Sequence, residues 1–262
     1  MIKTIKLFVN NSKDKAFSIA ELVKKELINA NYTITDNNPD LVIGFGGDGT
    51  LLRWLNSENY LPTSKYIGVN CGTLGFMQDF EIDDAKKFVK NIPNYIEKQI
   101  PFISIEISKG QNTVIYNAIN DFNTLNGDDK SFRCNVSIGE EFLETFVGTG
   151  LIFASPTGST AHNISSIGSI VYPTMEVIQI TPQEAIVNSK IRCLPKSICI
   201  PKGVNISLTP VNKDKIKVIA DGIKVYHDTF DKINIYYSKF SLTKLTTSDD
   251  NFIQKVREKL IL

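Results

Sequence analysis

In the first third of the chain, hydrophobic and polar residues follow two alternating patterns. Three short, mostly apolar runs are typical of strands in a parallel sheet that is covered on both faces: residues 5–9, 41–45 and 66–70. After the first run, apolar residues recur at helical spacing, at Ala16, Ala20, Val23 and Leu27. A second helix is predicted over residues 50–56. Alternating strands and helices indicate an α/β domain whose ligand lies at the carboxyl ends of the strands.

After Pro93 the pattern changes to short segments that are rich in β-branched and aromatic residues and separated by turn residues. They predict strands at residues 96–108, 113–119, 132–138, 141–147, 204–208, 216–220, 225–226 and 233–237. The pair Asp221-Gly222 between two of these strands predicts a tight hairpin. Residues 249–260 begin with Asp249-Asp250 and predict a closing helix, with apolar residues four apart at Phe252, Val256 and Leu260.

These patterns predict two domains. The first is an α/β domain with a parallel sheet, formed by residues 1–94 together with 246–262. The second is a mainly antiparallel, β-rich domain formed by residues 95–245. A chain of 262 residues, of which 42% are hydrophobic, is long enough to bury the core that each domain needs.

Composition narrows the possible functions. Lys and Arg exceed Asp and Glu by 29 to 28, so the net charge of +1 gives no general electrostatic reason to bind nucleic acid. No apolar run reaches the length of a membrane span, and the chain starts directly as a strand. Four scattered cysteines and two distant histidines predict neither a zinc site nor a disulfide framework. We therefore expect a cytoplasmic protein without nucleic-acid or membrane partners.

A glycine-rich turn at residues 44–49, Gly-Phe-Gly-Gly-Asp-Gly, connects the second apolar run to the predicted helix. Glycines let a phosphate approach backbone amides, and the N-terminus of a helix favours anions, which makes Gly46, Gly47 and Gly49 candidates for phosphate binding. The turn also carries Asp48, which would repel a pyrophosphate unless a metal ion or a reacting hydroxyl lay between them. The sequence thus predicts a phosphate-binding turn with a built-in acid or base.

Other interpretations of this turn stay open on the residues alone. The glycines match the GxGxxG dinucleotide pattern, but the next strand, residues 66–70, supplies no acid for a ribose, and the chain contains no GxxxxGK[ST] loop. Asp48 is also a good helix-capping residue, and glycine turns of this kind occur for packing.

Two further segments carry candidate chemistry. A second glycine-rich loop follows the strand at 66–70 and runs from Asn70 to Phe76; alternatively it is a tight turn with Leu74 and Phe76 packed inward. In the other segment, residues 155–160, uncharged donors of the kind that bind ribose and phosphate crowd around a turn, at Ser155, Thr157, Ser159 and Thr160. A helix is expected to start near Ser159, and these hydroxyls could instead cap it.

Four motifs, in this order and at these separations, resemble the NAD kinase family. They are Gly46-Gly-Asp-Gly-Thr50, Asn70-x-Gly-x-Leu-Gly-Phe76, Asn120-Asp121 and Ser155-Pro-Thr-Gly-Ser-Thr-Ala161. The first motif is shared with diacylglycerol and sphingosine kinases and is close to the GGDGS of phosphofructokinases, so it defines only the wider superfamily. The other three motifs select NAD kinase, and the resemblance spans about residues 5–225.

The resemblance implies ATP-dependent phosphorylation of the 2′-hydroxyl of the adenosine ribose of NAD, with Mg²⁺, to give NADP. Asp48 would be the catalytic residue that activates or orients this hydroxyl, and Gly49 with the neighbouring amides would hold phosphates. Asn120 and Asp121 match a pair that holds the nucleoside ribose, and Phe76 would pack beside the adenine. The remaining implied nucleotide contacts are Asn70, Thr149, Thr157, Thr160, Ala161, His162, Asn163 and Ser165. Family members are usually homodimers or homotetramers, and no protein residue is assigned as a metal ligand.

The chain departs from the family pattern at several of these positions. Thr149 replaces an aspartate, His162 replaces a tyrosine, Asp121 replaces a glutamate, and Ile167-Gly168-Ser169 replaces a segment with paired glycines. These changes bear on nucleotide affinity and leave Asp48 untouched. A non-catalytic dinucleotide sensor and a lipid or small-alcohol kinase of the same superfamily stay as alternatives. ATP or polyphosphate as donor, and NAD or NADH as acceptor, also stay open.

Overall fold

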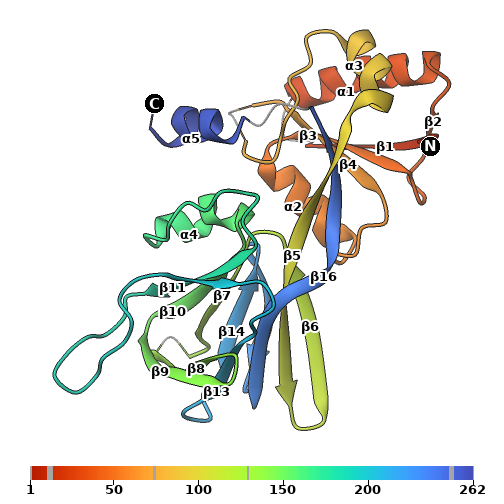
Figure 1. Ribbon diagram of the computed structural model, residues 1–262. Helices are drawn as coiled ribbons and strands as arrows, with labels where there is room; N and C mark the ends of the chain where they lie inside the picture. The colour runs from red at the N-terminus through yellow and green to blue at the C-terminus, as the bar shows by residue number, and fades with distance from the viewer. Residues whose placement is uncertain (1, 11–13, 73–74, 129, 248–250, 262) are drawn as a thin grey trace. The chain divides into compact units, whose positions relative to one another are not determined.

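The computed structural model describes residues 2–10, 14–72, 75–128, 130–247 and 251–261, and the chain divides into two compact units (Figure 1). The first unit comprises Met1–Ile100 and Ser241–Leu262, and the second comprises Pro101–Phe240. Among the described residues, no helix has both the length and the apolar character needed to cross a membrane.

The first unit is built on a parallel sheet with the strand order β2–β1–β3–β4–β16. Its strands are β1 (Thr4–Val9), β2 (Thr33–Ile34), β3 (Leu41–Gly46), β4 (Lys65–Asn70) and the last part of β16 (Lys232–Thr246). β3 is buried along its whole length, as expected for a strand covered on both faces. In the register of β3 and β4, Gly46 lies opposite Asn70. The two glycine-rich segments that follow these strands therefore begin side by side.

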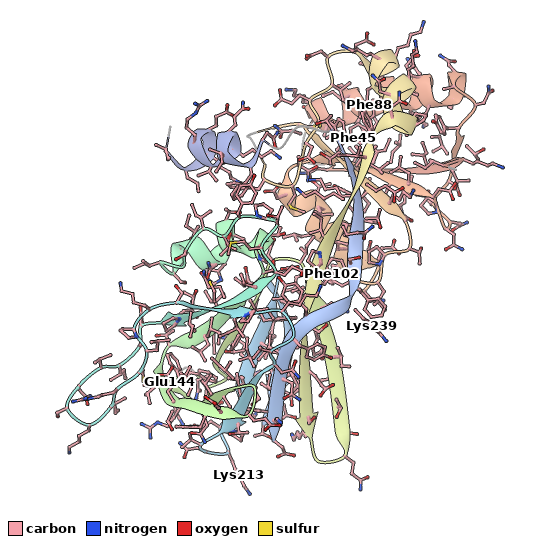
Figure 2. All side chains as sticks on the ribbon, viewed as in Figure 1. Phe45, Phe88, Phe102, Glu144, Lys213 and Lys239 are labelled. Carbon is pink, nitrogen blue, oxygen red and sulfur yellow. The ribbon has the colours of Figure 1, made fainter. Side chains whose placement is uncertain are left out.

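Helices cover both faces of this sheet. In Figure 1, α1 (Asp14–Asn29) and α3 (Ala85–Asn91) lie on one face and α2 (Asp48–Ser57) lies on the other. The four apolar positions that predicted α1 are its four buried residues: Ala16, Ala20, Val23 and Leu27. Figure 2 shows Phe45 of β3 and Phe88 of α3 in the core that α1 and α3 share with the sheet. On the opposite face, Trp54 of α2 stacks on Tyr66 of β4, with ring centroids 5.0 Å apart.

Two short helices complete the first unit. The 3-10 turn η1 (Ile92–Asn94) follows α3, and α5 (Phe252–Leu260) lies near the end of the chain. The predicted closing helix is therefore confirmed over residues 252–260, while Asp249 and Asp250 lie outside the described residues. The buried residue of α5 is Lys255, which lies on the same face of the helix as the half-buried Phe252 and Val256.

The second unit contains two mainly antiparallel sheets, which confirms the predicted fold class. One sheet is formed by β5 (Ile96–Lys109), β6 (Asn112–Ala118), β8 (Phe132–Ile138), β9 (Glu141–Gly148), β13 (Ile206–Pro210) and the first part of β16. The other has the order β12–β11–β10–β7–β14–β15, with strands β7 (Asp121–Asn126), β10 (Gly150–Ala154), β11 (Val177–Gln183), β12 (Ile198–Pro201), β14 (Ile216–Ala220) and β15 (Ile223–Asp228). Apolar side chains of both sheets form one core.

Two connections in the second unit matter for the site. The hairpin between β14 and β15 has φ of 46° at Asp221 and 84° at Gly222, which is the left-handed conformation that the Asp-Gly pair predicts. After β10, the chain forms a 3-10 turn, η2 (Thr157–Thr160), and then the single turn α4 (His162–Ser165). The helix expected near Ser159 is thus split into two short pieces.

Candidate active site

Asp48 lies at the point where β3 gives way to α2. The strand ends at Gly46, Gly47 is the N-cap of the helix, and Asp48 is its first residue. The Asp48 carboxylate accepts a hydrogen bond from the backbone N–H of Phe76 on Oδ2 and another from that of Met77 on Oδ1, each at 2.9 Å. Asp48 therefore binds the loop after β4 and does not serve as the cap of α2. Two of about four lone-pair positions on its oxygens remain for other donors.

The glycines of the turn divide into two kinds. A Cβ on Gly46 would lie 2.1 Å from Thr50 Oγ1, so this glycine permits close packing of the turn on the helix. By contrast, a Cβ on Gly47 or Gly49 would have no atom of the described residues within 4 Å. The packing interpretation thus applies to Gly46, while the backbone at Gly47 and Gly49 is open to an approaching group, as the predicted phosphate contact requires.

The loop that holds Asp48 depends on Gly75. A Cβ at this position would lie 2.4 Å from Asp48 Oδ1, so any side chain here would displace the carboxylate. Gly75 belongs to one of the sequence motifs, but no role was predicted for it. Phe76 is half-buried, and Leu74, for which inward packing was the alternative, lies outside the described residues.

Asn70 ends β4 beside Gly46 and is almost completely buried. Its Nδ2 donates to Glu81 Oε1 at 3.2 Å, and its Oδ1 accepts from the backbone N–H of Gly72 at 3.3 Å. It also lines a polar cavity of about 220 Å³, together with Gln78, Asp79, Glu81, Asn251, Gln254, Lys255 and Glu258.

Lys255 connects α5 to the loop that holds Asp48. Its buried ammonium donates to the carbonyls of Phe76 and Gln78, at 2.9 and 3.1 Å, and to Asp79 Oδ1 at 2.8 Å. Asp79 Oδ2 forms a second ion pair, with Lys244 Nζ at 2.8 Å. Burial alone would raise the pKa of Asp79, but the two lysines outweigh it and lower that pKa to about 2. The carboxylate is therefore charged at every ordinary pH.

Lys259, one turn further along α5, approaches the Asp48 carboxylate itself. Its Nζ lies 3.5 Å from Asp48 Oδ2 and 4.6 Å from the centroid of the Phe76 ring. Neither of these lysines of α5 was predicted from the sequence. An isolated lysine on a predicted helix carries no signal, and some 200 residues separate them from the glycine turn.

In the second unit, Asn120 and Asp121 lie at the start of β7, where the side chain of Asp221 binds the backbone. The Asp221 carboxylate accepts from the backbone N–H groups of Ile119, Asn120 and Asp121 at 2.9, 2.8 and 3.1 Å. The sequence predicted the hairpin at Asp221 but not this contact. Burial, followed by the charge of Asp221, raises the pKa of Asp121 to about 7, and a hydrogen bond from the backbone of His162 partly opposes this rise.

The hydroxyls of Ser155 and Ser159 stabilise the turn that contains them. Ser155 Oγ donates to the carbonyl of Ile119 at 2.5 Å and accepts from the N–H of Gly158 at 3.1 Å. Ser159 Oγ donates to the carbonyl of Pro156 at 2.7 Å. Both side chains are buried, so the expectation that they line a ligand site is wrong for these two, and the alternative structural role is the one observed.

The other predicted residues of this segment differ in exposure. A Cβ on Gly158 would lie 2.0 Å from the carbonyl oxygen of Asn120, so the turn packs directly against the Asn120-Asp121 pair. The predicted ligand residues that keep solvent exposure here are Thr157, Thr160, Ala161, His162 and Ser165.

Asn163 differs from its neighbours because its side chain lies in the core. Its Nδ2 donates to Gln179 Oε1 at 2.7 Å, and its Oδ1 accepts from Thr181 Oγ1 at 2.6 Å. The residue is fully buried, so its side chain fastens α4 to β11 and is not presented to a ligand.

Thr149 and Ser165, both predicted nucleotide contacts, line one cavity of about 450 Å³. Thr149 Oγ1 donates to Glu184 Oε2 at 2.5 Å, and Glu184 lines the same cavity. Glu184 was not predicted from the sequence, although it places a carboxylate directly beside the threonine that replaces the family's aspartate. Nothing in its local sequence distinguishes it from a surface glutamate.

Comparisons with known proteins agree on one family. A family model described as the ATP-NAD kinase N-terminal domain matches residues 10–97, and one described as the ATP-NAD kinase C-terminal domain matches residues 124–246. The NAD kinase of Finegoldia magna is 30% identical over 270 residues, which cover 99% of this chain and 98% of that protein.

Solved structures share the fold. Yeast NADH kinase, crystallised with NADH, matches with a TM-score of 0.86 at 19% identity, covering 99% of this chain and 87% of its own. An NAD kinase from Archaeoglobus fulgidus in complex with ATP matches with a TM-score of 0.77 at 20% identity, covering 98% and 99%.

Proposed function

The chain belongs to the ATP-NAD kinase family, and we propose that it transfers the γ-phosphoryl group of ATP to the 2′-hydroxyl of the adenosine ribose of NAD, giving NADP and ADP. The observation that carries the proposed mechanism is the setting of Asp48. A carboxylate is fixed by two backbone amides on a turn where Gly47 and Gly49 leave the backbone open.

In this mechanism, the 2′-oxygen forms a bond to the γ-phosphorus while the bond from that phosphorus to the β,γ-bridging oxygen breaks. The electron pair leaves with ADP, and the hydroxyl proton passes to Asp48 and then to solvent. A secondary alcohol is too weak an acid to ionise unaided at neutral pH. A positioned base typically accelerates such a step by about 10²- to 10⁴-fold. Alignment of the two reactants supplies much of the remainder.

The nucleotide contacts that we propose in the second unit follow from exposure and charge. Asp121, when ionised, accepts hydrogen bonds from a ribose diol beside Asn120. Thr157, Thr160 and Ala161, which are half-buried, and His162, which is exposed, lie next to this pair and supply further contacts. Thr149 and Ser165 contribute through the cavity that they share.

Mg²⁺ belongs to the same proposal as a companion of ATP. Within the described parts of the chain, no three His, Cys, Asp or Glu residues are grouped in a way that could hold a metal ion. In kinases, Mg²⁺ binds mainly to substrate phosphates and to only one or two carboxylates of the protein. Asp48 is the carboxylate on the glycine turn that would face it. When bound, the ion neutralises charge that develops on the phosphates.

We also propose a cytoplasmic homo-oligomer. All four cysteines lie in the described part of the chain and none of them forms a disulfide there, which suits a reducing compartment. β6 ends one sheet of the second unit, and Val114 and Ile115 on it are exposed apolar residues that a second copy could cover. Light scattering coupled to size exclusion measures the assembly, and a monomer at micromolar concentration would contradict this part of the proposal.

The activity is tested with purified protein, NAD, ATP and Mg²⁺. The product is measured with a dehydrogenase that is specific for NADP, and NADH and polyphosphate are assayed in parallel as acceptor and donor. NADP that accumulates in proportion to protein supports the proposal. Binding of NAD without turnover would favour a dinucleotide sensor, and phosphorylation of a lipid or small alcohol in place of NAD would favour the wider superfamily.

A further inference from the structure

The helix α5 presents two lysines to the loop that holds Asp48. The two lysines differ in how many N–H donors of the ammonium group are available to a ligand. Lys255 is buried and uses its three N–H donors on the carbonyls of Phe76 and Gln78 and on Asp79. Lys255 is thus a positioning residue: it holds the carbonyl side of a loop whose amide side holds Asp48.

Lys259 has its donors available. Within the described part of the chain, its ammonium neighbours are Asp48 Oδ2 at 3.5 Å, which is longer than a good hydrogen bond, and the Phe76 ring. The side chain keeps 36% of its exposed surface, so an incoming ligand can reach it. The ring centroid at 4.6 Å is within cation–π range and keeps the ammonium near the carboxylate.

We propose that Lys259 is a catalytic residue that binds the transferred phosphoryl group through its ammonium. This inference rests on the proposed function. The hydroxyl that Asp48 activates lies within hydrogen-bond reach of the carboxylate, roughly 2.6–3.2 Å, and the phosphorus approaches that hydroxyl to about 3–3.5 Å. A cation already 3.5 Å from Oδ2 is therefore within side-chain reach of the phosphoryl oxygens.

The chemistry of the step favours a cation at this place. Negative charge is spread over the equatorial oxygens of the transferred group in the transition state, and a fixed positive charge stabilises it. In the free enzyme the same ammonium faces the Asp48 carboxylate, which offsets the repulsion between that acid and the arriving phosphates. When the phosphoryl group binds, Lys259 exchanges a carboxylate partner for a phosphate partner.

The test compares Lys259→Met and Lys259→Arg with a matched control, Arg257→Met. Arg257 lies on the same helix, is exposed, and carries the same charge, but no contact with Asp48 is found for it among the described residues. We expect Lys259→Met to lower kcat/KM for ATP by roughly 10²- to 10³-fold, as the loss of one contact that stabilises transition-state charge does. Lys259→Arg should recover most of this loss, and Arg257→Met should stay within about twofold of the unaltered protein.

Binding and stability separate a catalytic from a structural role. In Lys259→Met, the affinity for NAD alone and the unfolding midpoint should stay unchanged, while the affinity for an ATP analogue weakens. Unchanged kinetics, an equal loss in Arg257→Met, or a loss that follows a lower unfolding midpoint would each overturn the inference. If the unaltered protein makes no NADP, the proposed function fails, yet ATP-analogue binding to the two Lys259 variants still reports on the phosphate contact.

Discussion

At the scale of single residues, Asp48 and Asp121 are two carboxylates in opposite surroundings. Asp48 is fixed by two amides, whereas Asp121 is buried beside the charge of Asp221, which raises its pKa to about 7. Asp48 was predictable because a carboxylate among glycines is unusual for a phosphate turn. The setting of Asp121 was not, because it depends on a hairpin that is 100 residues away in sequence.

The role of Asp48 gives the first prediction. Asp48→Asn keeps a group of nearly the same shape but removes the proton acceptor, so we expect turnover to fall by about 10²- to 10⁴-fold while NAD still binds. Initial rates of NADP formation and a titration with NAD measure the two effects. The side-chain amide of this variant cannot receive the proton as a carboxylate does, so unchanged turnover would remove Asp48 from the mechanism.

Asp121 gives a pH prediction. Only the ionised carboxylate accepts hydrogen bonds from both hydroxyls of a ribose, and its pKa lies at about 7. Affinity for NAD should therefore strengthen by about tenfold between pH 6 and pH 8. Asp121→Asn should bind more weakly at pH 8 and show no such dependence. A tenfold change that persists in Asp121→Asn would assign the titration to another group.

At the scale of elements, the sequence predicted correctly the helices and strands whose buried residues are apolar and whose exposed residues are polar. The helical period of α1 is confirmed, and so are the strands β1, β3 and β4 that the three apolar runs predicted. Each of these elements has one clear apolar face or is a continuous apolar run. The strands β7 and β10–β12 were missed. β7 shows why: Asn123, Thr124 and Asn126 are polar yet buried, so the segment does not read as a core strand. Such burial depends on partners in other strands, which the local sequence does not reveal.

The ion pairs that tie together β16, the loop after β4 and α5 give a prediction at this scale. Asp79→Asn would leave the ammonium groups of Lys244 and Lys255 buried without a counter-charge, which we expect to lower the free energy of unfolding by about 3–5 kcal/mol. Urea unfolding at pH 7 measures the change. The exposed pair Lys65–Glu97 is the matched control, and Glu97→Gln should cost at most about 1 kcal/mol.

The direction of the pH effect follows from the lowered pKa of Asp79. A carboxyl group whose pKa is about 2 in the folded protein and 3.8 as a reference contributes stability above the reference value. That contribution is lost as the pH falls through 2. The difference in stability between the natural protein and Asp79→Asn should therefore be constant from pH 5 to 8 and shrink in acid. A difference of less than about 1 kcal/mol at pH 7 would show that the two lysines find other partners.

At the scale of the whole molecule, the proposed tasks are divided between the two units: Asp48 belongs to the first, and Asn120 with Asp121 to the second. If the ribose contacts of the second unit supply NAD affinity, NAD at 100 times its Kd should stabilise the folded protein by about 2.7 kcal/mol. For a chain of this size, that raises the thermal midpoint by several degrees. Asp48→Asn should keep the shift and Asp121→Asn should lose most of it at pH 8. If instead Asp48→Asn lost the shift and Asp121→Asn kept it, Asp48 and not Asp121 would supply the affinity for NAD. The proposed division of tasks between the two units would then be wrong.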